Sequence, residues 1–175
     1  AGLIPLSRAR AAGPICTVDP GGGGNYTTIG AAVADPGCTT INVASGVYTE
    51  NITLDRDLTL SGAGAGSTIV DGNGSVTYQR VVTITSSSGV VISGVTIQHG
   101  HVLTGNSGCG GIRNLGTLTL TNAVVRDNIV DVYDYHDLGG GICNLSTLRL
   151  DNVTLRGNSA HRGGAIFSND VLTIT

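Results

Sequence analysis

The chain has 175 residues, of which 28 are Gly, and it contains neither Met nor Trp. Aromatic residues make up 3% of it and charged residues 12%, the net charge is −3, and the nine basic residues are all Arg. This balance argues against nucleic-acid binding, which needs a concentrated basic surface. No apolar run approaches the roughly 20 residues of a membrane-spanning helix. Aliphatic side chains set among Thr, Ser, Asn and Gly favour narrow, stacked β-strands.

Residues 13–39 are predicted to form a cap that precedes the repetitive part of the chain. Within this cap, residues 28–34 predict a short helix, because Ile29, Ala32 and Val33 share one helical face and an Asp-Pro-Gly sequence follows. A helix of this kind covers the open end of a stack of strands, which otherwise exposes bare strand edges and apolar side chains.

Four cysteines show no C-x-x-C spacing, so the sequence gives no support for a zinc site or a thioredoxin-like motif. Cys16 and Cys38 flank the cap and are predicted to form a disulfide, which secretion would favour. Cys109 and Cys143 lie in successive repeats but at different places within them. The sequence leaves their pairing open, and the simplest interpretation is two buried thiols.

Residues 40–175 contain an internal repeat. The sequence GGIRNLGTLTLTNAVVRDN at 110–128 matches GGICNLSTLRLDNVTLRGN at 140–158, and a shorter copy, GAIFSNDVLTIT, occupies 164–175. Weaker copies precede them, and the residues that open the strands lie at Leu58, Val90, Leu118, Leu148 and Leu172. Each repeat therefore uses about 24 to 32 residues, a period typical of solenoids.

Within a repeat, apolar and polar residues alternate, as in Leu118, Thr119 and Leu120, which is the pattern of a strand with one buried face. Strands this short must stack on their equivalents, in parallel and about 4.8 Å apart, around an aliphatic interior. Asn residues recur at equivalent corners and are expected to stack their amides. The pairs are Asn114 with Asn144, Asn122 with Asn152, and Asn128 with Asn158.

Residues 26–54, with their Tyr-Thr-Thr-Ile start and Gly-Val-Tyr-Thr-Glu-Asn turn, resemble the N-terminal cap of pectin-lyase-like right-handed β-helix proteins. The strings GGGICN and GGAIFSN are similar to the repeats of polymorphic outer-membrane-type surface proteins. Together with the repeat, this resemblance implies an all-β, single-stranded right-handed parallel β-helix of about five coils with a short N-terminal capping helix.

The enzymes of this family carry motifs that the chain lacks. Pectin methylesterase-like enzymes supply two catalytic Asp residues in Gln-Asp-Thr and Val-Asp-Phe-Ile-Phe-Gly contexts, and neither string is present. A fold by itself implies no activity. We therefore predict no catalytic residue, no metal ligand and no cofactor. His99 and His101 are interpreted as surface-turn histidines, and Asp71 and Asp127 as turn residues.

An insertion at residues 129–138, IVDVYDYHDL, concentrates acidic and aromatic side chains. It is either a solvated loop with its tyrosines against the solenoid wall, or a contact for a partner, a sugar or a metal ion. The residues that would make a partner or glycan contact are Asp131, Tyr133, Asp134, Tyr135, His136 and Asp137.

The two ends of the chain suggest self-association. Residues 1–12 form an arm ahead of the cap, and residues 171–175 stop inside a strand with no polar coil after it. The alternative is a fragment cut from a longer β-helix. The residues expected at a head-to-tail contact are Leu3, Ile4 and Leu6 in the arm, and Val171, Leu172 and Ile174 in the last strand.

These features predict a non-enzymatic extracellular or cell-surface scaffold that assembles head-to-tail into a fibre or acts as an adhesin. The alternatives are a carbohydrate-active enzyme of the pectin-lyase type and a glycan-binding module. Its expected partners are further copies of itself, or a surface glycan or protein, with no nucleic acid and no membrane span. N-x-S/T sequons permit N-glycosylation at Asn25, Asn51, Asn73, Asn144 and Asn152.

Overall fold

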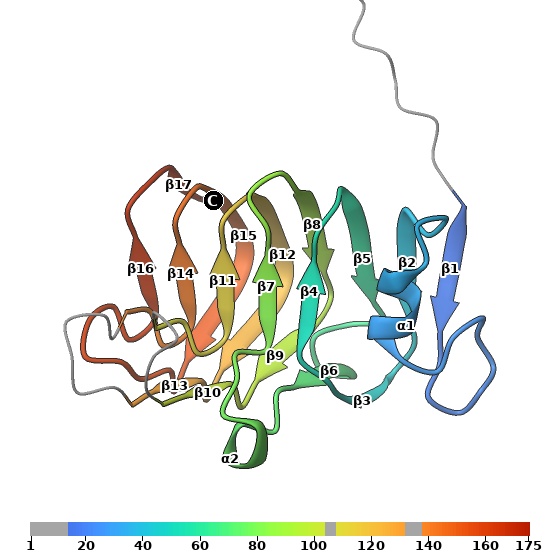
Figure 1. Ribbon diagram of the computed structural model, residues 1–175, viewed down its shortest axis with the longest axis horizontal. Helices are drawn as coiled ribbons and strands as arrows, with labels where there is room; N and C mark the ends of the chain where they lie inside the picture. The colour runs from blue at the N-terminus through green and yellow to red at the C-terminus, as the bar shows by residue number, and fades with distance from the viewer. Residues whose placement is uncertain (1–13, 104–107, 132–137) are drawn as a thin grey trace, which may run out of the picture.

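The computed structural model describes residues 14–103, 108–131 and 138–175. Its strands wind into coils stacked along one axis, with the N-terminal coils at one end of the stack and the C-terminal coils at the other (Figure 1). All the strand pairs between coils are parallel. The predicted parallel β-solenoid of about five turns, a right-handed pectin-lyase-like β-helix, is confirmed.

Each coil contributes strands to three faces. The first face contains β1 (Ile15–Val18), β2 (Thr40–Val43), β5 (Leu58–Gly62), β8 (Gly89–Ser93), the first halves of β12 (Thr117–Arg126) and β15 (Thr147–Arg156), and β17 (Leu172–Ile174). The second face contains β3 (Gly46–Thr49), β6 (Thr68–Asp71), β9 (Thr96–Gln98) and the second halves of β12 and β15. The third face contains β4 (Ile52–Leu54), β7 (Val82–Ile84), β11 (Ile112–Asn114), β14 (Ile142–Asn144) and β16 (Ile166–Ser168).

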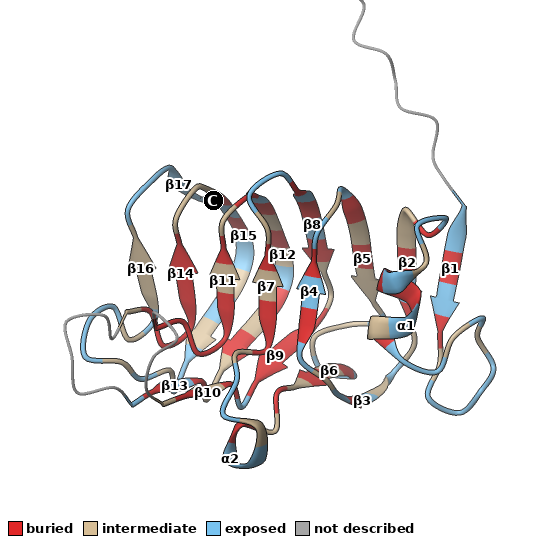
Figure 2. Ribbon diagram, viewed as in Figure 1, coloured by how far each residue is buried: buried red, intermediate tan, exposed pale blue. Residues whose placement is uncertain are grey.

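The register between coils follows the repeat. Leu58, Val90, Leu118, Leu148 and Leu172 lie opposite one another in a single column, which confirms the predicted alignment. All of these side chains except that of Leu172 are buried. The interior is a continuous aliphatic column between the three faces (Figure 2). Because burial of one such side chain contributes about 1.5–3 kcal/mol, the stacked column is the main source of stability.

Helix α1 (Ile29–Ala34) confirms the predicted cap helix. Ile29, Ala32 and Val33 are buried, and the Thr28 hydroxyl accepts a hydrogen bond from the backbone N–H of Ala31 at 3.2 Å. The Glu50 carboxylate accepts bonds from the first N–H groups of the helix, at 2.8 and 2.7 Å. The predicted disulfide between Cys16 and Cys38 is present, with a Cα–Cα distance of 5.5 Å.

The Tyr26 hydroxyl donates a hydrogen bond to the Asp35 carboxylate just after α1. This bond, together with the backbone N–H of Gly37, holds the pKa of Asp35 below its ordinary value. A carboxyl whose pKa is lowered by folding adds stability above its unfolded pKa and loses it as the pH falls through the folded pKa. Tyr26→Phe should therefore be less stable than the wild type at pH 7, and the difference in stability should narrow as the pH falls below about 4. Urea unfolding across this range tests it, and a difference that does not change with pH would contradict it.

Cys109 and Cys143, whose pairing the sequence left open, form a disulfide with a Cα–Cα distance of 5.3 Å, so the interpretation as two buried thiols is corrected. Cys109 has a positive φ of 71°, and its N–H donates to the Leu138 carbonyl at 2.7 Å. This turn carries Cys109 to the start of the next coil, beside Cys143. A comparison of repeat positions alone does not reveal such a turn.

The predicted amide columns are present. Asn114 Nδ2 donates to Asn144 Oδ1 at 2.8 Å, Asn152 Nδ2 donates to Asn122 Oδ1 at 2.7 Å, and Asn128 Nδ2 donates to Asn158 Oδ1 at 3.0 Å. Asn114 and Asn144 are fully buried, whereas Asn122 and Asn152 are exposed. The same Asn–Asn contact therefore occurs once in the interior and once on the surface.

Asn114→Ala should lower the free energy of unfolding by about 3 kcal/mol, because it removes three hydrogen bonds made by a fully buried amide. The amide donates to Asn144 Oδ1 and to the Thr147 carbonyl, at 2.8 and 2.9 Å, and accepts from the Gly116 N–H at 3.2 Å. Asn122→Gly is the matched control. It removes an exposed amide at a φ of 49°, which Gly adopts readily, and should cost less than about 0.5 kcal/mol. Equal losses in urea unfolding would show that burial is not the cause.

The helices in the described ranges are too short to cross a membrane.

Candidate active site

A row of polar side chains lies where three strands of the second face end. Asp71, Gln98 and Arg126 are in register at the ends of β6, β9 and β12. His99 and Asp127 each follow one of these residues directly. Because neighbouring coils are about 4.8 Å apart, residues separated by almost 30 positions in the sequence become neighbours in space.

Asp71 is the best connected of these residues. Its Oδ2 lies 2.8 Å from His99 Nδ1 and accepts a hydrogen bond from Gln98 Nε2 at 2.7 Å, while its Oδ1 accepts from the backbone N–H of Asn73 at 2.9 Å. Burial, the largest effect, raises the pKa of Asp71, but the three hydrogen bonds and the nearby imidazole outweigh it and leave the pKa below its ordinary value. Asp71 is therefore a carboxylate at neutral pH, held in a fixed orientation.

One ring nitrogen of His99 faces Asp71. Much of the remaining ring faces solvent, and the His99 side chain as a whole is 48% exposed. A carboxylate beside Nδ1 fixes the tautomer in which Nδ1 carries the proton and Nε2 is the acceptor. An imidazole oriented in this way is a general base, and the carboxylate stabilises the imidazolium that forms when it takes a proton.

Two buried polar atoms beside this pair make no hydrogen bond within the described residues. They are Gln98 Oε1 and His101 Nε2. Gln98 is only 6% exposed, and the His101 ring packs edge-on against Tyr78 with ring centroids 5.6 Å apart. Since buried polar atoms are nearly always paired, two unpaired ones in one place indicate a site prepared for water or a ligand.

The backbone here adopts a conformation that L-residues rarely use. His99 has a φ of 55° and Asp127 a φ of 54°, while Gly157, which follows the next strand end in the same column, has a φ of 63°. The left-handed region costs a residue with a Cβ about 1–2 kcal/mol. His and Asp thus stand at positions where Gly would be less strained, a pattern that clusters at functional sites.

A pocket of about 410 Å³ opens over this row and is lined by Asp71, Asn73, Gly74, Ser75, His99, His101, Asp127 and Ile129. Its floor depends on the absence of a side chain at Gly74, the first residue of helix α2 (Gly74–Thr77). A Cβ there would lie 2.5 Å from the His99 carbonyl and from the His101 Cβ. Gly74 therefore lets α2 lie directly on residues 99–101 and form one wall. We call Asp71, Gln98, His99, His101 and Asp127 the polar cluster.

The polar cluster can activate a water molecule. In such a step His99 Nε2 would be the base and Asp71 would orient the ring. Asp127 would supply a second carboxylate on the following coil, where Arg126 Nη1 contacts it at 3.0 Å. In the described part of the chain, no group of three or more His, Cys, Asp or Glu side chains is placed to hold a metal ion. The chemistry that the cluster supports is general acid-base catalysis.

His99 does lie in a surface turn, with its side chain 48% exposed, but a carboxylate beside it was not predicted from the sequence. The carboxylate comes from the preceding coil, 28 residues earlier. Asp71 does make the predicted turn bond, to the N–H of Asn73, and the histidine contact is additional. Asp71 and Gln98 share one repeat position and His99 follows Gln98 directly, so the signal in the sequence was the alignment of the repeats.

Those other predicted contact residues that the structure describes lie outside the polar cluster. Tyr133, Asp134, Tyr135, His136 and Asp137 lie outside the described residues, as do Leu3, Ile4 and Leu6, and Asp131 is exposed. Val171, Leu172 and Ile174 are exposed by 54%, 37% and 67%.

The Asn residues of the five sequons differ in their exposure to solvent. Asn144 is fully buried and donates to Ser168 and to the Val171 carbonyl, so the fold leaves no room for a glycan on it. The prediction for Asn144 is therefore wrong. Asn25, Asn51 and Asn152 are exposed and Asn73 is half-buried, so glycosylation at these four positions stays a prediction.

No family model matches the chain, and no curated protein sequence does. The solved structures that resemble it include two pectin methylesterases. One is a pectin methylesterase in complex with a hexasaccharide, at 17% identity and a TM-score of 0.50, covering 77% of this chain and 48% of that one. The other is pectin methylesterase PemA from Erwinia chrysanthemi, at 13% identity and a TM-score of 0.55, covering 83% of this chain and 49% of that one. The chain spans about half the length of either. At such identities the likeness establishes the fold.

The comparison also corrects the functional prediction. The chain was expected to be a non-enzymatic scaffold or adhesin, whereas the solved structures that share its fold are enzymes. The finding contradicts the scaffold prediction and favours its alternative, a carbohydrate-active enzyme.

Proposed function

We propose that the chain is a carbohydrate-active enzyme that hydrolyses an ester on a polysaccharide, with Asp71 and His99 as its acid-base pair. One observation carries the proposal: the 2.8 Å contact between the Asp71 carboxylate and His99 Nδ1 at the edge of an open pocket. The names of the two similar structures support the substrate class, because both are pectin methylesterases.

The proposed reaction uses groups that the pocket holds. His99 Nε2 removes a proton from a water molecule as the water attacks the ester carbonyl, and Asp71 stabilises the resulting imidazolium. The imidazolium then returns the proton to the departing alcohol, so the products are a carboxylic acid and an alcohol. His101 lines the pocket, and Gln98 holds the Asp71 carboxylate through its 2.7 Å hydrogen bond.

An extracellular location agrees with this role. The structure contains two disulfides, Cys16–Cys38 and Cys109–Cys143, and disulfides persist mainly in oxidising compartments. Polysaccharide substrates of the pectin type lie outside the cell membrane, so a secreted enzyme would meet them there.

The test is to incubate the purified chain with methyl-esterified pectin and to measure released methanol and new reducing ends. We expect methanol release that falls at least about 100-fold in His99→Gln, and none from fully de-esterified pectin. If new reducing ends form without methanol, the activity is cleavage of the polysaccharide chain and not ester hydrolysis. If neither product forms above the rate of a heat-unfolded control, the proposed function is wrong.

A further inference from the structure

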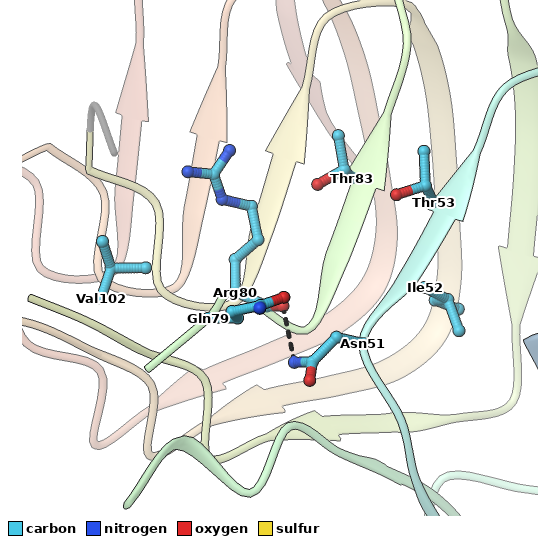
Figure 3. A pocket seen from close by; sticks show the side chains of 7 residues that line it. All are labelled: Asn51, Ile52, Thr53, Gln79, Arg80, Thr83 and Val102. Carbon is cyan, nitrogen blue, oxygen red and sulfur yellow. Dashed lines mark hydrogen bonds between the residues drawn. The ribbon is translucent and has the colours of Figure 1, made fainter. Parts of the chain in front are cut away.

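A second pocket, separate from the polar cluster, lies beside the third face and is shown in Figure 3. Its described lining carries hydroxyl, amide and guanidinium groups, and its volume is about 260 Å³. The lining residues are Asn51, Ile52, Thr53, Gln79, Arg80, Thr83 and Val102. The first pocket uses residues 71–75 and this one uses residues 79–83, so the two adjoin opposite ends of the segment that carries α2.

The third face presents a polar column next to this pocket. Thr53, Thr83 and Arg113 are opposite one another on β4, β7 and β11, and each is the central, outward-facing residue of its three-residue strand. In Figure 3 the Thr53 and Thr83 side chains lie side by side, with the Arg80 side chain extended on the side of Thr83 away from Thr53. A guanidinium and two hydroxyl groups therefore converge on one surface.

Arg113 lies opposite Thr83 on the neighbouring strand, and Thr83 lines the pocket together with Arg80, so the two positive charges lie on one surface. Burial, followed by the charge of Arg113, lowers the pKa of Arg80. Arg80 Nη2 donates to the Gly108 carbonyl at 3.5 Å. Arg113 Nε is buried and makes no hydrogen bond within the described part of the chain, and it is the third such side-chain atom there besides Gln98 Oε1 and His101 Nε2. An anion that contacts both guanidinium groups reduces the repulsion between them.

We propose that Arg113, Arg80 and Thr83 form an oxyanion-binding subsite that holds a carboxylate or sulfate group of an acidic polysaccharide. Guanidinium groups match the planar, two-oxygen geometry of such anions and bind them through charge-assisted hydrogen bonds. The Thr83 hydroxyl adds a donor. The choice of a polysaccharide as the ligand rests on the proposed function, whereas the oxyanion chemistry rests on the arginine pair alone.

The test measures binding without turnover, by isothermal titration calorimetry with ester-free probes. Polygalacturonate supplies carboxylates, dextran sulfate supplies sulfates, and dextran is the neutral match. We expect one or both anionic polymers to bind and dextran not to bind, and the tighter of the two identifies the group. Arg113→Gln should weaken that binding at least about tenfold. Arg149→Gln, which removes an exposed Arg from the first face, should leave it within about twofold.

Several outcomes overturn the subsite: no binding of either anion, equal binding of dextran, or equal losses in the two Arg variants, which would indicate a general charge effect. Thr83→Val keeps the proposal testable if Arg113→Gln fails to fold, because it removes a hydroxyl without changing shape, and it should weaken binding about threefold. Since no ester is present, loss of binding and loss of hydrolysis are independent results. Binding without hydrolysis supports the subsite and leaves only the proposed reaction wrong.

Discussion

Asp71→Asn is expected to lower the rate of pectin-ester hydrolysis by about 10²- to 10⁴-fold while the fold is retained. The amide occupies the same space as the carboxylate but cannot stabilise an imidazolium at 2.8 Å. The amide nitrogen can also turn towards His99 and impose the wrong tautomer. Methanol release under saturating substrate measures the effect on kcat.

Asp151→Asn is the matched control for this variant. It removes the same charge from an exposed position on β15, away from the polar cluster, and should keep activity within about twofold. The double variant Asp71→Asn/His99→Gln should be no slower than the worse of its single variants, because the two residues act as one unit. Additive losses, or an Asp71→Asn variant as active as Asp151→Asn, would exclude the acid-base pair.

Gly100→Ala is expected to lower the free energy of unfolding by about 3 kcal/mol, a loss typical of a group forced into a packed interior. A Cβ at Gly100 would lie 1.9 Å from the Gly110 carbonyl oxygen and 2.7 Å from its carbon. These are backbone atoms of the next coil and cannot turn aside. The coils must move apart, and the bond from the Gly100 N–H to Asn128 Oδ1, now 2.8 Å, would be lost or lengthened.

Gly66→Ala provides the comparison, because no atom lies within 4 Å of the Cβ that it would add. That substitution should be neutral or should stabilise by up to about 1 kcal/mol by restricting the unfolded chain. Urea unfolding of both variants separates the close approach of two coils from the general effect of replacing Gly. Similar stabilities for the two variants would mean that the coils adjust to the added methyl group.

The solenoid was predictable because the same pattern of apolar, Asn and Gly residues recurs several times in the sequence. The column from Leu58 to Leu172 and the Asn114–Asn144 pair follow from alignment of the repeats, since stacking turns equal positions into contacts. The cap helix was predictable from three apolar residues on one face and the Asp-Pro-Gly sequence that follows it.

The polar cluster was not predicted because its residues differ from coil to coil. Asp71, Gln98 and Arg126 share one repeat position but not one residue type, so a search for repeated or adjacent motifs passes over them. The left-handed backbone at His99 and Asp127, and the turn that brings Cys109 to Cys143, depend on backbone angles that no side-chain pattern encodes. A search for known enzyme motifs also missed the polar cluster, because its residues are not adjacent in the sequence.

The Cys109–Cys143 disulfide also determines how the molecule responds to mechanical load. In a solenoid each coil is held mainly by its neighbours, so tension from the C-terminal side peels the coils away one after another. The peeling would remove β17, β16 and β15 and then reach Cys143, where the disulfide transfers the force to Cys109 and bypasses the residues between them. Asp71, Gln98 and His99 lie on the far side of Cys109 and would keep their contacts. Asp127 lies inside the bypassed segment and carries no tension while the bond is intact. Part of the polar cluster would thus keep its arrangement in a chain under tension.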